Sequence, residues 1–380
     1  MRALCEVQPL KIIVDRKELL SAVNTAKAAV SNKSALPILG SLLLQAADGK
    51  LYVTGSNLAE HIRTWVACQV DVQGQCLCPA HRLAGLLAKT QTQDVVIESP
   101  KEGAVTTFKC GDALATMPGD APDMFPPSPF GQGGYDSFSL DSDRLLEIIN
   151  SVSFAMCNDP TRANLMCLRI EFGAEHATFV ATNGHIVSVA LAPECGCNTD
   201  IHGLSMPYTS VAKLTGLLRA GGQCTVYFSD TELACELGNA TMVTRSMAST
   251  ALKWKPIFGS LKTTASYLIG RAPLLGALER QQLMVDDMHM SCLMEFKGNT
   301  MQLSSSTPIG KYSEALALEE KCETPGAIAL NPVYLSNVLR VQRSGVVRLQ
   351  TAGKNAPVQV MEHDSDPPFE IQNVIMSIRQ

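Results

Sequence analysis

The sequence predicts an α+β fold made of three similar repeats in one chain, for three reasons. The chain has 380 residues, more than one hydrophobic core normally serves, so two or three domains are expected. The order helix, strands, helix, strands recurs about every 125 residues. Residues 118–135 hold five prolines and four glycines, a composition typical of a connector between domains.

An amphipathic helix is predicted near the start of each repeat. In the first repeat, Asp15 and Glu18 have the spacing of a capping box, and apolar residues follow at helical intervals. In the third repeat, Pro273 suits the first turn of a helix. The three predicted helices cover residues 16–33, 143–157 and 271–285.

A strand pair and a second helix follow the first helix in every repeat. The strand pairs are predicted over residues 42–57, 167–185 and 292–306. The second helices are predicted over residues 80–91, 207–219 and 331–343, where Pro79, Pro207 and Pro332 mark the starts. Any α+β protein shows some alternation of helices and strands, but three repeats in the same order favour internal duplication. The predicted domains are residues 1–128, 136–260 and 261–380.

The distribution of charge bears on DNA binding. The net charge of −5 argues against a uniformly basic DNA-gripping surface. The six predicted helices, however, carry thirteen basic and four acidic residues, so the acidic charge lies elsewhere. Such helices suit a protein that surrounds a polyanion without gripping it, although Lys and Arg are also common on helix surfaces for helix propensity and solubility. The candidate DNA-facing residues are Lys17, Lys27, Lys33, Arg82, Lys89, Lys213, Arg219, Arg340 and Arg343.

The cellular compartment is predicted from the N-terminus and the cysteines. Charged residues interrupt the first fifteen positions, which leaves no signal peptide or membrane span, and no later segment is long and apolar enough to cross a membrane. The thirteen cysteines are odd in number and scattered, as expected in a reducing compartment. We therefore expect a cytoplasmic protein with no membrane partner.

Several short motifs carry a family resemblance. Residues 36–40 read Leu-Pro-Ile-Leu-Gly, residues 181–185 read Ala-Thr-Asn-Gly-His, and residues 375–379 read Ile-Met-Ser-Ile-Arg. Residues 114–118 resemble a Leu-x-Thr-(Leu/Met)-Pro motif. In this order and spacing the sequence resembles the bacterial DNA sliding clamps, the beta subunits of DNA polymerase III.

That resemblance implies an assembly and a set of partners. It implies three similar clamp domains per chain and a head-to-tail homodimer whose six domains form a ring, with helices lining the central hole and sheets outside. Such a ring is a processivity factor rather than an enzyme: it encircles double-stranded DNA without sequence specificity and slides along it. The implied protein partners are DNA polymerase III, the clamp loader and repair polymerases, which bind through short linear motifs.

The resemblance also implies a hydrophobic cleft between the second and third domains that binds those motifs. Its wall combines apolar side chains with a few polar anchors, as a peptide groove requires. The residues carried over by position are Leu165, Thr182, Gly184, His185, Ile186, Val187, Ile257, Asn331, Tyr334, Val374, Met376, Ser377, Ile378 and Arg379.

The chain departs from the family pattern at several of these positions. Ile186 stands where the family usually has Arg, Ser377 replaces a Pro, and residues 251–254 read Ala-Leu-Lys-Trp instead of Phe-Pro-x-Tyr. We therefore expect a different motif preference. Asp112 and Ala113 lie in a stretch that is usually basic and takes part in the subunit interface.

Two alternative functions remain at this point. Two short clusters, Cys76-x-Cys78 with His81 and Cys195-x-Cys197 with His202, would be the basis of a metal-dependent hydrolase. Their Cys-x-Cys spacing differs from the usual Cys-x-x-Cys, so we expect no metal. The glycine pairs lack the context of nucleotide-binding loops, and His185 stands without a nucleophile pattern, so we expect no cofactor and no catalytic residue. The second alternative is a clamp-like peptide-binding module that does not form a ring.

Overall fold

The computed structural model describes residues 9–31, 36–100, 105–128, 130, 134–248, 253–286, 290–363 and 367–378. The chain forms two compact units. The first comprises Met1–Asp143 with Ala212–Ser246, and the second comprises Arg144–Val211 with Met247–Gln380. Among the described residues, no helix is long and apolar enough to cross a bilayer.

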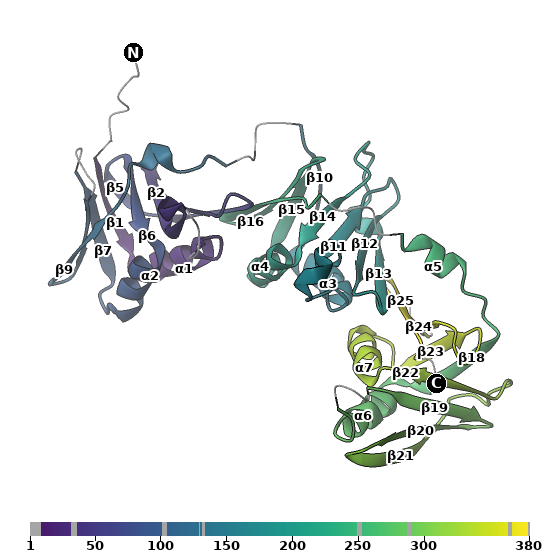
Figure 1. The fold of residues 1–380 in the computed structure, drawn as a ribbon. Helices are drawn as coiled ribbons and strands as arrows, with labels where there is room; N and C mark the ends of the chain where they lie inside the picture. The colour runs from purple at the N-terminus through teal and green to yellow at the C-terminus, as the bar shows by residue number, and fades with distance from the viewer. Residues whose placement is uncertain are drawn as a thin grey trace. The chain divides into compact units, whose positions relative to one another are not determined.

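The same order of elements occurs three times along the chain: a strand, a helix, four strands, a helix and three strands (Figure 1). The first domain has one additional strand, β5. Its elements are β1 (Leu10–Asp15), α1 (Arg16–Lys27), β2 (Ser41–Ala47), β3 (Lys50–Ser56), β4 (Glu60–Ala67), β5 (Gln69–Val72), β6 (Gly74–Pro79), α2 (Ala80–Lys89), β7 (Asp94–Ser99), β8 (Val105–Cys110) and β9 (Ala113–Pro118).

The second and third domains repeat that order. The second contains β10 (Asp136–Asp141), α3 (Ser142–Ser153), β11 (Cys167–Glu171), β12 (Ala177–Thr182), β13 (Ile186–Ala192), β14 (Leu204–Pro207), α4 (Tyr208–Leu218), β15 (Gln223–Phe228), β16 (Glu232–Leu237) and β17 (Ala240–Arg245). The third contains β18 (Ala265–Gly270), α6 (Arg271–Gln282), β19 (Cys292–Lys297), β20 (Thr300–Thr307), β21 (Gly310–Ala317), β22 (Gly326–Leu330), α7 (Pro332–Val341), β23 (Val346–Thr351), β24 (Val358–Glu362) and β25 (Glu370–Ile375). The linking helix α5 (Lys255–Gly259) precedes it, and short 3-10 turns lie at Pro37–Gly40, Pro122–Met124, Pro160–Leu165 and Pro193–Cys195.

The strands form four antiparallel sheets, two in each unit. The first unit holds the sheets β5-β1-β7-β8-β9 and β10-β15-β16-β17-β4-β3-β2-β6. The second unit holds the sheets β14-β11-β12-β13-β25-β24-β23-β18 and β21-β20-β19-β22. One sheet of a domain therefore continues into the next domain, through β17 paired with β4 and β13 paired with β25. This continuity explains why three repeats form two compact units.

The predicted starts of the six helices lie within one residue of the starts in the structure, and side-chain caps specify those of α1 and α7. The Asp15 side chain accepts hydrogen bonds from the backbone N–H groups of Lys17 and Glu18, and α1 buries Leu19 and Val23. In the first domain α1 lies beside α2, and in the third α6 lies beside α7 (Figure 1). The predicted end of α1 at residue 33 is wrong, because the N–H of Ala28 bonds to the carbonyl three residues back and the helix stops at Lys27.

Candidate functional site

The first candidate surface consists of the basic residues predicted to face DNA. Lys17 on α1, Arg82 and Lys89 on α2, and Arg219 just after α4 are exposed, whereas Lys27 is half-buried. Lys33 lies outside the described residues. The first unit therefore presents several cations on its helices without a carboxylate partner among the described residues.

Lys213 has an intramolecular partner. Its ammonium group bonds to the carboxylate of Glu60, whose side chain is only 3% exposed, and Asn57 donates a second hydrogen bond to the same carboxylate at 2.8 Å. Because a buried carboxylate without a counter-charge is costly, Lys213 is needed to neutralise Glu60. We therefore do not expect Lys213 to be a main contact to DNA phosphates.

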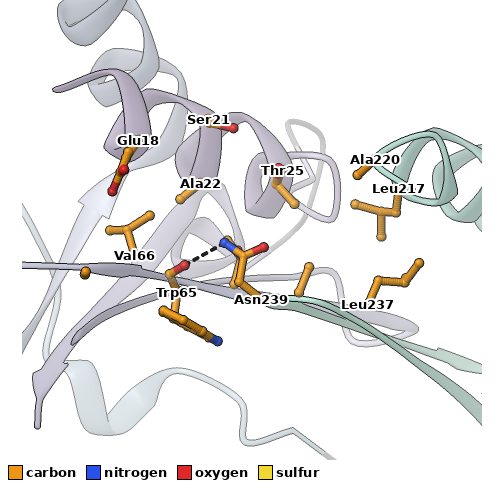
Figure 2. Close-up of a pocket in the computed structure, with 13 residues that line it drawn as sticks. Glu18, Ser21, Ala22, Thr25, Trp65, Val66, Leu217, Ala220, Leu237 and Asn239 are labelled. Carbon is orange, nitrogen blue, oxygen red and sulfur yellow. Dashed lines mark hydrogen bonds between the residues drawn. The ribbon is translucent and has the colours of Figure 1, made fainter. Parts of the chain in front are cut away.

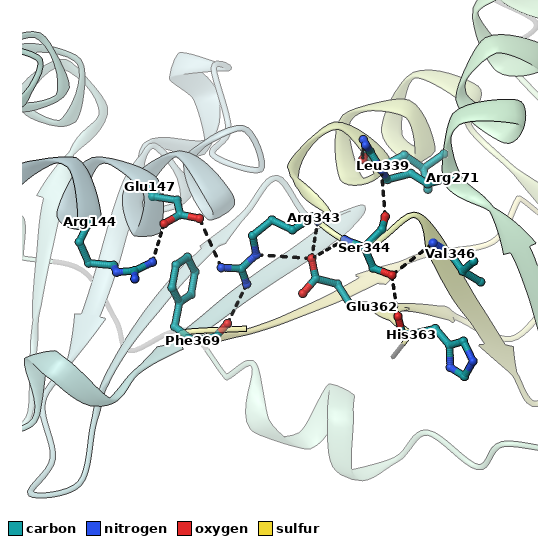
Figure 3. Close-up of polar contacts among 10 residues, drawn as sticks. All are labelled: Arg144, Glu147, Arg271, Leu339, Arg343, Ser344, Val346, Glu362, His363 and Phe369. Atoms are coloured by element: carbon teal, nitrogen blue, oxygen red, sulfur yellow. Dashed lines mark hydrogen bonds and ion pairs between the residues drawn. The ribbon is translucent and has the colours of Figure 1, made fainter. Parts of the chain in front are cut away.

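Arg343 is also held within the protein (Figure 3). Its guanidinium lies 3.3 Å from a carboxylate oxygen of Glu147 on α3 and 3.5 Å from one of Glu362. It donates to the carbonyl of Phe369 at 2.8 Å and lies 4.3 Å from the centre of that ring. Arg343 thus ties the second domain to the third, whereas Arg340 is exposed and forms an ion pair across the surface at 3.0 Å.

A pocket of about 510 Å³ lies between α1 and α4 over strands β4 and β17 (Figure 2). Its lining is mainly small and apolar and includes Ala22, Leu217 and Leu237. Glu18 is the one charged residue among those lining it, so this pocket adds no cation to the helix surface.

The second candidate surface is the predicted peptide cleft, whose centre is the turn between β12 and β13. The side-chain oxygen of Asn183 accepts hydrogen bonds from the N–H groups of His185 and Ile186, each at 2.9 Å. The Thr182 hydroxyl bonds to the Ile186 carbonyl at 2.5 Å and accepts from the Gly184 N–H at 3.0 Å. Gly184 has φ +88°, a conformation that L side chains rarely adopt, so the turn requires glycine there.

The turn contacts residues of the third domain. The imidazole of His185 stacks on the ring of Tyr334, and the side chain of Asn331 caps α7, where Tyr334 lies in the first turn. The Met376 N–H donates to the His185 carbonyl at 2.8 Å, and the Ile378 N–H donates to the Ala329 carbonyl at 2.8 Å. Residues 376–378 therefore run between a turn of the second domain and a strand of the third.

The predicted cleft residues divide into a surface set and a supporting set. The surface set is at least partly exposed: Leu165, Gly184, His185, Ile257, Asn331, Tyr334, Met376, Ser377 and Ile378. The supporting set is buried in the sheet beneath: Thr182, Ile186, Val187 and Val374. Ile186 is 1% exposed, so the residue that stands where the family usually has Arg is packed in the sheet and does not belong to the surface set. Arg379 lies outside the described residues.

Comparison with protein families decides the assignment. Models of the N-terminal, central and C-terminal domains of the DNA polymerase III beta subunit match residues 10–128, 139–250 and 261–379. The chain belongs to the DNA polymerase III beta subunit family. As in the predicted fold, this sliding clamp contains three clamp domains of mixed helix and sheet.

Individual relatives and solved structures agree with this assignment. The beta sliding clamp of Chlamydia trachomatis is 22% identical over 342 residues, which cover 90% of this chain and 81% of the relative. The fold matches the crystal structure of the Bacillus subtilis sliding clamp with a TM-score of 0.91 at 19% identity, over 98% of this chain and 99% of that one. A Pseudomonas aeruginosa sliding clamp bound to griselimycin matches with a TM-score of 0.89 at 20% identity, over 98% and 100% of the two chains.

Clamp-family membership argues against the metal-dependent hydrolase, and so does the local structure. Within the described ranges, no group of three or more His, Cys, Asp or Glu side chains could hold a metal ion. Cys76 and Cys78 are buried in β6, and the hydrogen bond that the Cys78 thiol donates to Cys76, together with burial, raises the pKa of Cys78 well above its usual value. Neutral buried thiols are structural residues.

Arg162 and Trp254 were not placed in the wall of the predicted cleft from the sequence, although both lie beside it. Arg162 donates to the Asn183 carbonyl at 2.8 Å and lies 3.4 Å from Asp159. Trp254 donates from its indole nitrogen to Glu171 at 3.2 Å and packs with Phe258 on the valines of β12 and β13. The departure from the family pattern at Trp254 was the available signal, whereas Arg162 carried none.

Proposed function

We propose that two copies of this chain close head to tail into a ring that encircles double-stranded DNA and slides along it. The ring tethers DNA polymerase III, the clamp loader and repair polymerases through the cleft, in the cytoplasm where the chromosome is copied. The observation that carries this proposal is the repeated pairing of edge strands between successive domains.

The two junctions within the chain follow one rule. The last strand of the second domain, β17, pairs with β4 of the first, and the last strand of the third, β25, pairs with β13 of the second. β4, β13 and β21 are each the third strand after the first helix of their domain. By this rule, a third junction would pair β21 with the last strand of another domain. The remaining last strand is β9, and both β9 and β21 are sheet edges in this chain. Pairing β21 with β9 of a second copy supports a head-to-tail contact that repeats once to close a dimer.

Exposed apolar side chains at these two edges support the same contact. Leu114 on β9 is 69% exposed. At the other end, Leu283 and Ile309 are 76% and 59% exposed, and Met284 is exposed as well. Leu283 and Met284 directly follow α6, and Ile309 directly precedes β21. Large apolar side chains are also exposed elsewhere, at Leu36 and Met124, so those beside the free edges are supporting evidence only for a surface that another subunit covers.

The helix cations supply the proposed contact with DNA. Lys17, Arg82, Lys89 and Arg219 are exposed, and with Lys27, Lys33 and Arg340 they form the set that we propose to face the phosphates. Because the restraint of a ring is topological, these contacts need little affinity, and salt screening leaves the ring free to slide. Lys213 and Arg343 are left out of this set, because carboxylates of the same chain neutralise them.

The cleft supplies the proposed contact with polymerase motifs. The stacked pair of His185 and Tyr334 and the segment 376–378 offer apolar side chains beside the polar side chain of Ser377. Burying about 300 Å² of apolar peptide surface at about 25 cal/mol/Å² yields about 7 kcal/mol before ordering costs. Affinities no tighter than the micromolar range follow, which allows partners to exchange.

The decisive experiment measures retention on DNA of different topology. After loading by a clamp loader onto nicked circular DNA, the protein should remain bound through gel filtration, and cutting the circle should release it. A dimeric mass in solution should accompany this behaviour. Equal retention on circular and linear DNA would contradict the ring and favour a peptide-binding module that does not encircle DNA.

A further inference from the structure

A cluster of two cations and two aromatic rings lies on β3 and β4 of the first domain. Tyr52 and Trp65 are directly paired across these strands. The Lys50 ammonium lies 3.9 Å from the centre of the Trp65 ring, and the Arg63 guanidinium lies 4.2 Å from the centre of the Tyr52 ring. We refer to these four residues as the cation–aromatic patch.

The patch is on the solvent side of the sheet. Along β3 and β4 its members alternate with the buried residues Leu51, Val53 and Val66. Because successive side chains of a strand point to opposite faces, the patch faces away from the core. Figure 2 shows the Trp65 ring on the side of the strand opposite to Val66 and α1. Arg63 is exposed and the other members of the patch are half-buried.

A pocket of about 280 Å³ adjoins the patch at Arg63. Its floor is the same sheet, and its wall is the proline-rich segment that follows β9. Within it, Gln45 donates to Gln75 at 3.0 Å, and Gln75 donates to Asp123 at 3.3 Å. The lining residues that matter here are Leu43, Gln45, Thr54, Arg63, Gln75 and Asp123.

The two cations of the patch have no carboxylate partner among the described residues. Their charged groups contact the aromatic rings, and cations over a ring keep free N–H donors on the outward side. Asp123 is the acidic residue of the adjoining pocket, and its carboxylate accepts from Gln75. The Lys50 end of the patch is therefore the more positive end.

We propose that the cation–aromatic patch and its pocket dock an extended acidic segment of a partner protein. Glutamate or aspartate side chains bind Lys50 and Arg63, while amide groups of the pocket hydrogen-bond the peptide backbone. Single-stranded nucleic acid fits less well, because base stacking needs free ring faces and a cation already covers a face of each ring. This site belongs to the first domain and is separate from the cleft of the second and third domains.

Tryptophan fluorescence can test this site directly, because Trp65 and Trp254 are the two tryptophans of the chain. The full-length Trp254→Phe protein reports Trp65 alone. The probe is a synthetic peptide of alternating glutamate and serine, titrated at low salt, and the control peptide carries glutamine in place of glutamate. We expect the acidic peptide to change Trp65 emission saturably and the control peptide to leave it unchanged.

Three variants locate the binding. Lys50→Gln with Arg63→Gln should weaken acidic-peptide binding about tenfold or more, and Asp123→Asn should tighten it about two- to threefold by removing a like charge. The matched control, Lys17→Gln with Arg82→Gln, removes two exposed helix cations and should leave the Trp65 titration unchanged. The proposal is overturned if the patch and control variants weaken binding equally. It is also overturned if the acidic peptide gives no response, or if single-stranded oligothymidylate binds Trp65 more tightly than the peptide.

Discussion

The imidazole of His185 and the phenol ring of Tyr334 stack with their centres 5.8 Å apart and their planes 21° apart. One ring belongs to the turn after β12 and the other to the first turn of α7, so the stack joins two domains. The Asn183 amide orients one partner and the Asn331 cap orients the other. The two rings are thus held in place in the unbound chain, which would reduce the entropy lost if the proposed motif peptide binds there.

Tyr334→Ala should weaken binding of a polymerase-derived motif peptide about tenfold or more. The change removes one ring of the proposed wall and leaves the imidazole of His185 without its stacking partner. Isothermal titration would measure the affinity. The matched control is Tyr208→Ala, which alters the exposed tyrosine that opens α4, the equivalent helix of the second domain. Equal losses in the two variants would argue against a specific role for the stack.

Deleting residues 377–380 should abolish motif binding while leaving the fold and the dimer intact. These residues follow the Met376 N–H bond to His185, and Val374 and Ile375 upstream remain paired with β13. A deletion that began at Val374 would instead remove fully buried core residues and confuse binding with stability. Circular dichroism and native mass would confirm the fold, and full retention of peptide affinity would contradict the cleft.

Lys213→Gln should destabilise the first unit by about 2–4 kcal/mol, because it leaves the Glu60 carboxylate buried without its counter-charge. Urea denaturation would measure this change. Arg219→Gln, at an exposed site one helical turn and a half further on, should change stability by less than about 0.5 kcal/mol. Combining Lys213→Gln with Glu60→Gln should restore most of the loss, and no recovery in the double variant would mean that another interaction of Lys213 matters more.

Local sequence signals predict the helices and strands, but they do not predict which distant strands and side chains pair. Asp15 and Asn331 cap helices within three residues of themselves, so their effect was readable from the sequence or from its repeats. The pairing of Ile186 with Ile375 joins residues far apart in the chain, and nothing local specifies that register. For the same reason Lys213 was predicted to face DNA before the buried Glu60 was known to need it.

Stability should depend on pH through His61, which is 4% exposed and bonds to Ser56 at 3.1 Å. Burial, assisted by the charge of Arg245, lowers its pKa from 6.5 to about 4. The unfolded chain therefore binds a proton between pH 6.5 and 4 that the folded chain does not, so stability is present above pH 6.5 and falls through this window. We expect this residue to account for about 2 kcal/mol of the stability lost between pH 7 and pH 5.

The check compares urea midpoints of the wild type and His61→Gln at pH 7 and pH 5. The urea midpoint of the variant should change less between the two pH values. The other titrating groups are the same in both proteins, so the difference reports His61. An identical loss of stability in the two proteins would show that His61 is not held neutral by the fold.

Replacing apolar residues beside either free edge should convert the proposed dimer into a monomer. Leu114→Asp would place a charge on β9, and Leu283→Asp would place one at the end of α6, each on a side chain that is mostly exposed in the single chain. A buried unpaired carboxylate at the seam would cost several kcal/mol, which is more than a dimer of moderate affinity can tolerate. Each variant should elute with a monomeric mass, keep its affinity for the motif peptide, and lose retention on nicked circular DNA.

The matched control is Leu58→Asp, which changes an exposed leucine at the turn between β3 and β4 and should leave the protein dimeric. If both edge variants stay dimeric and remain on circular DNA, the pairing of β21 with β9 is the wrong junction.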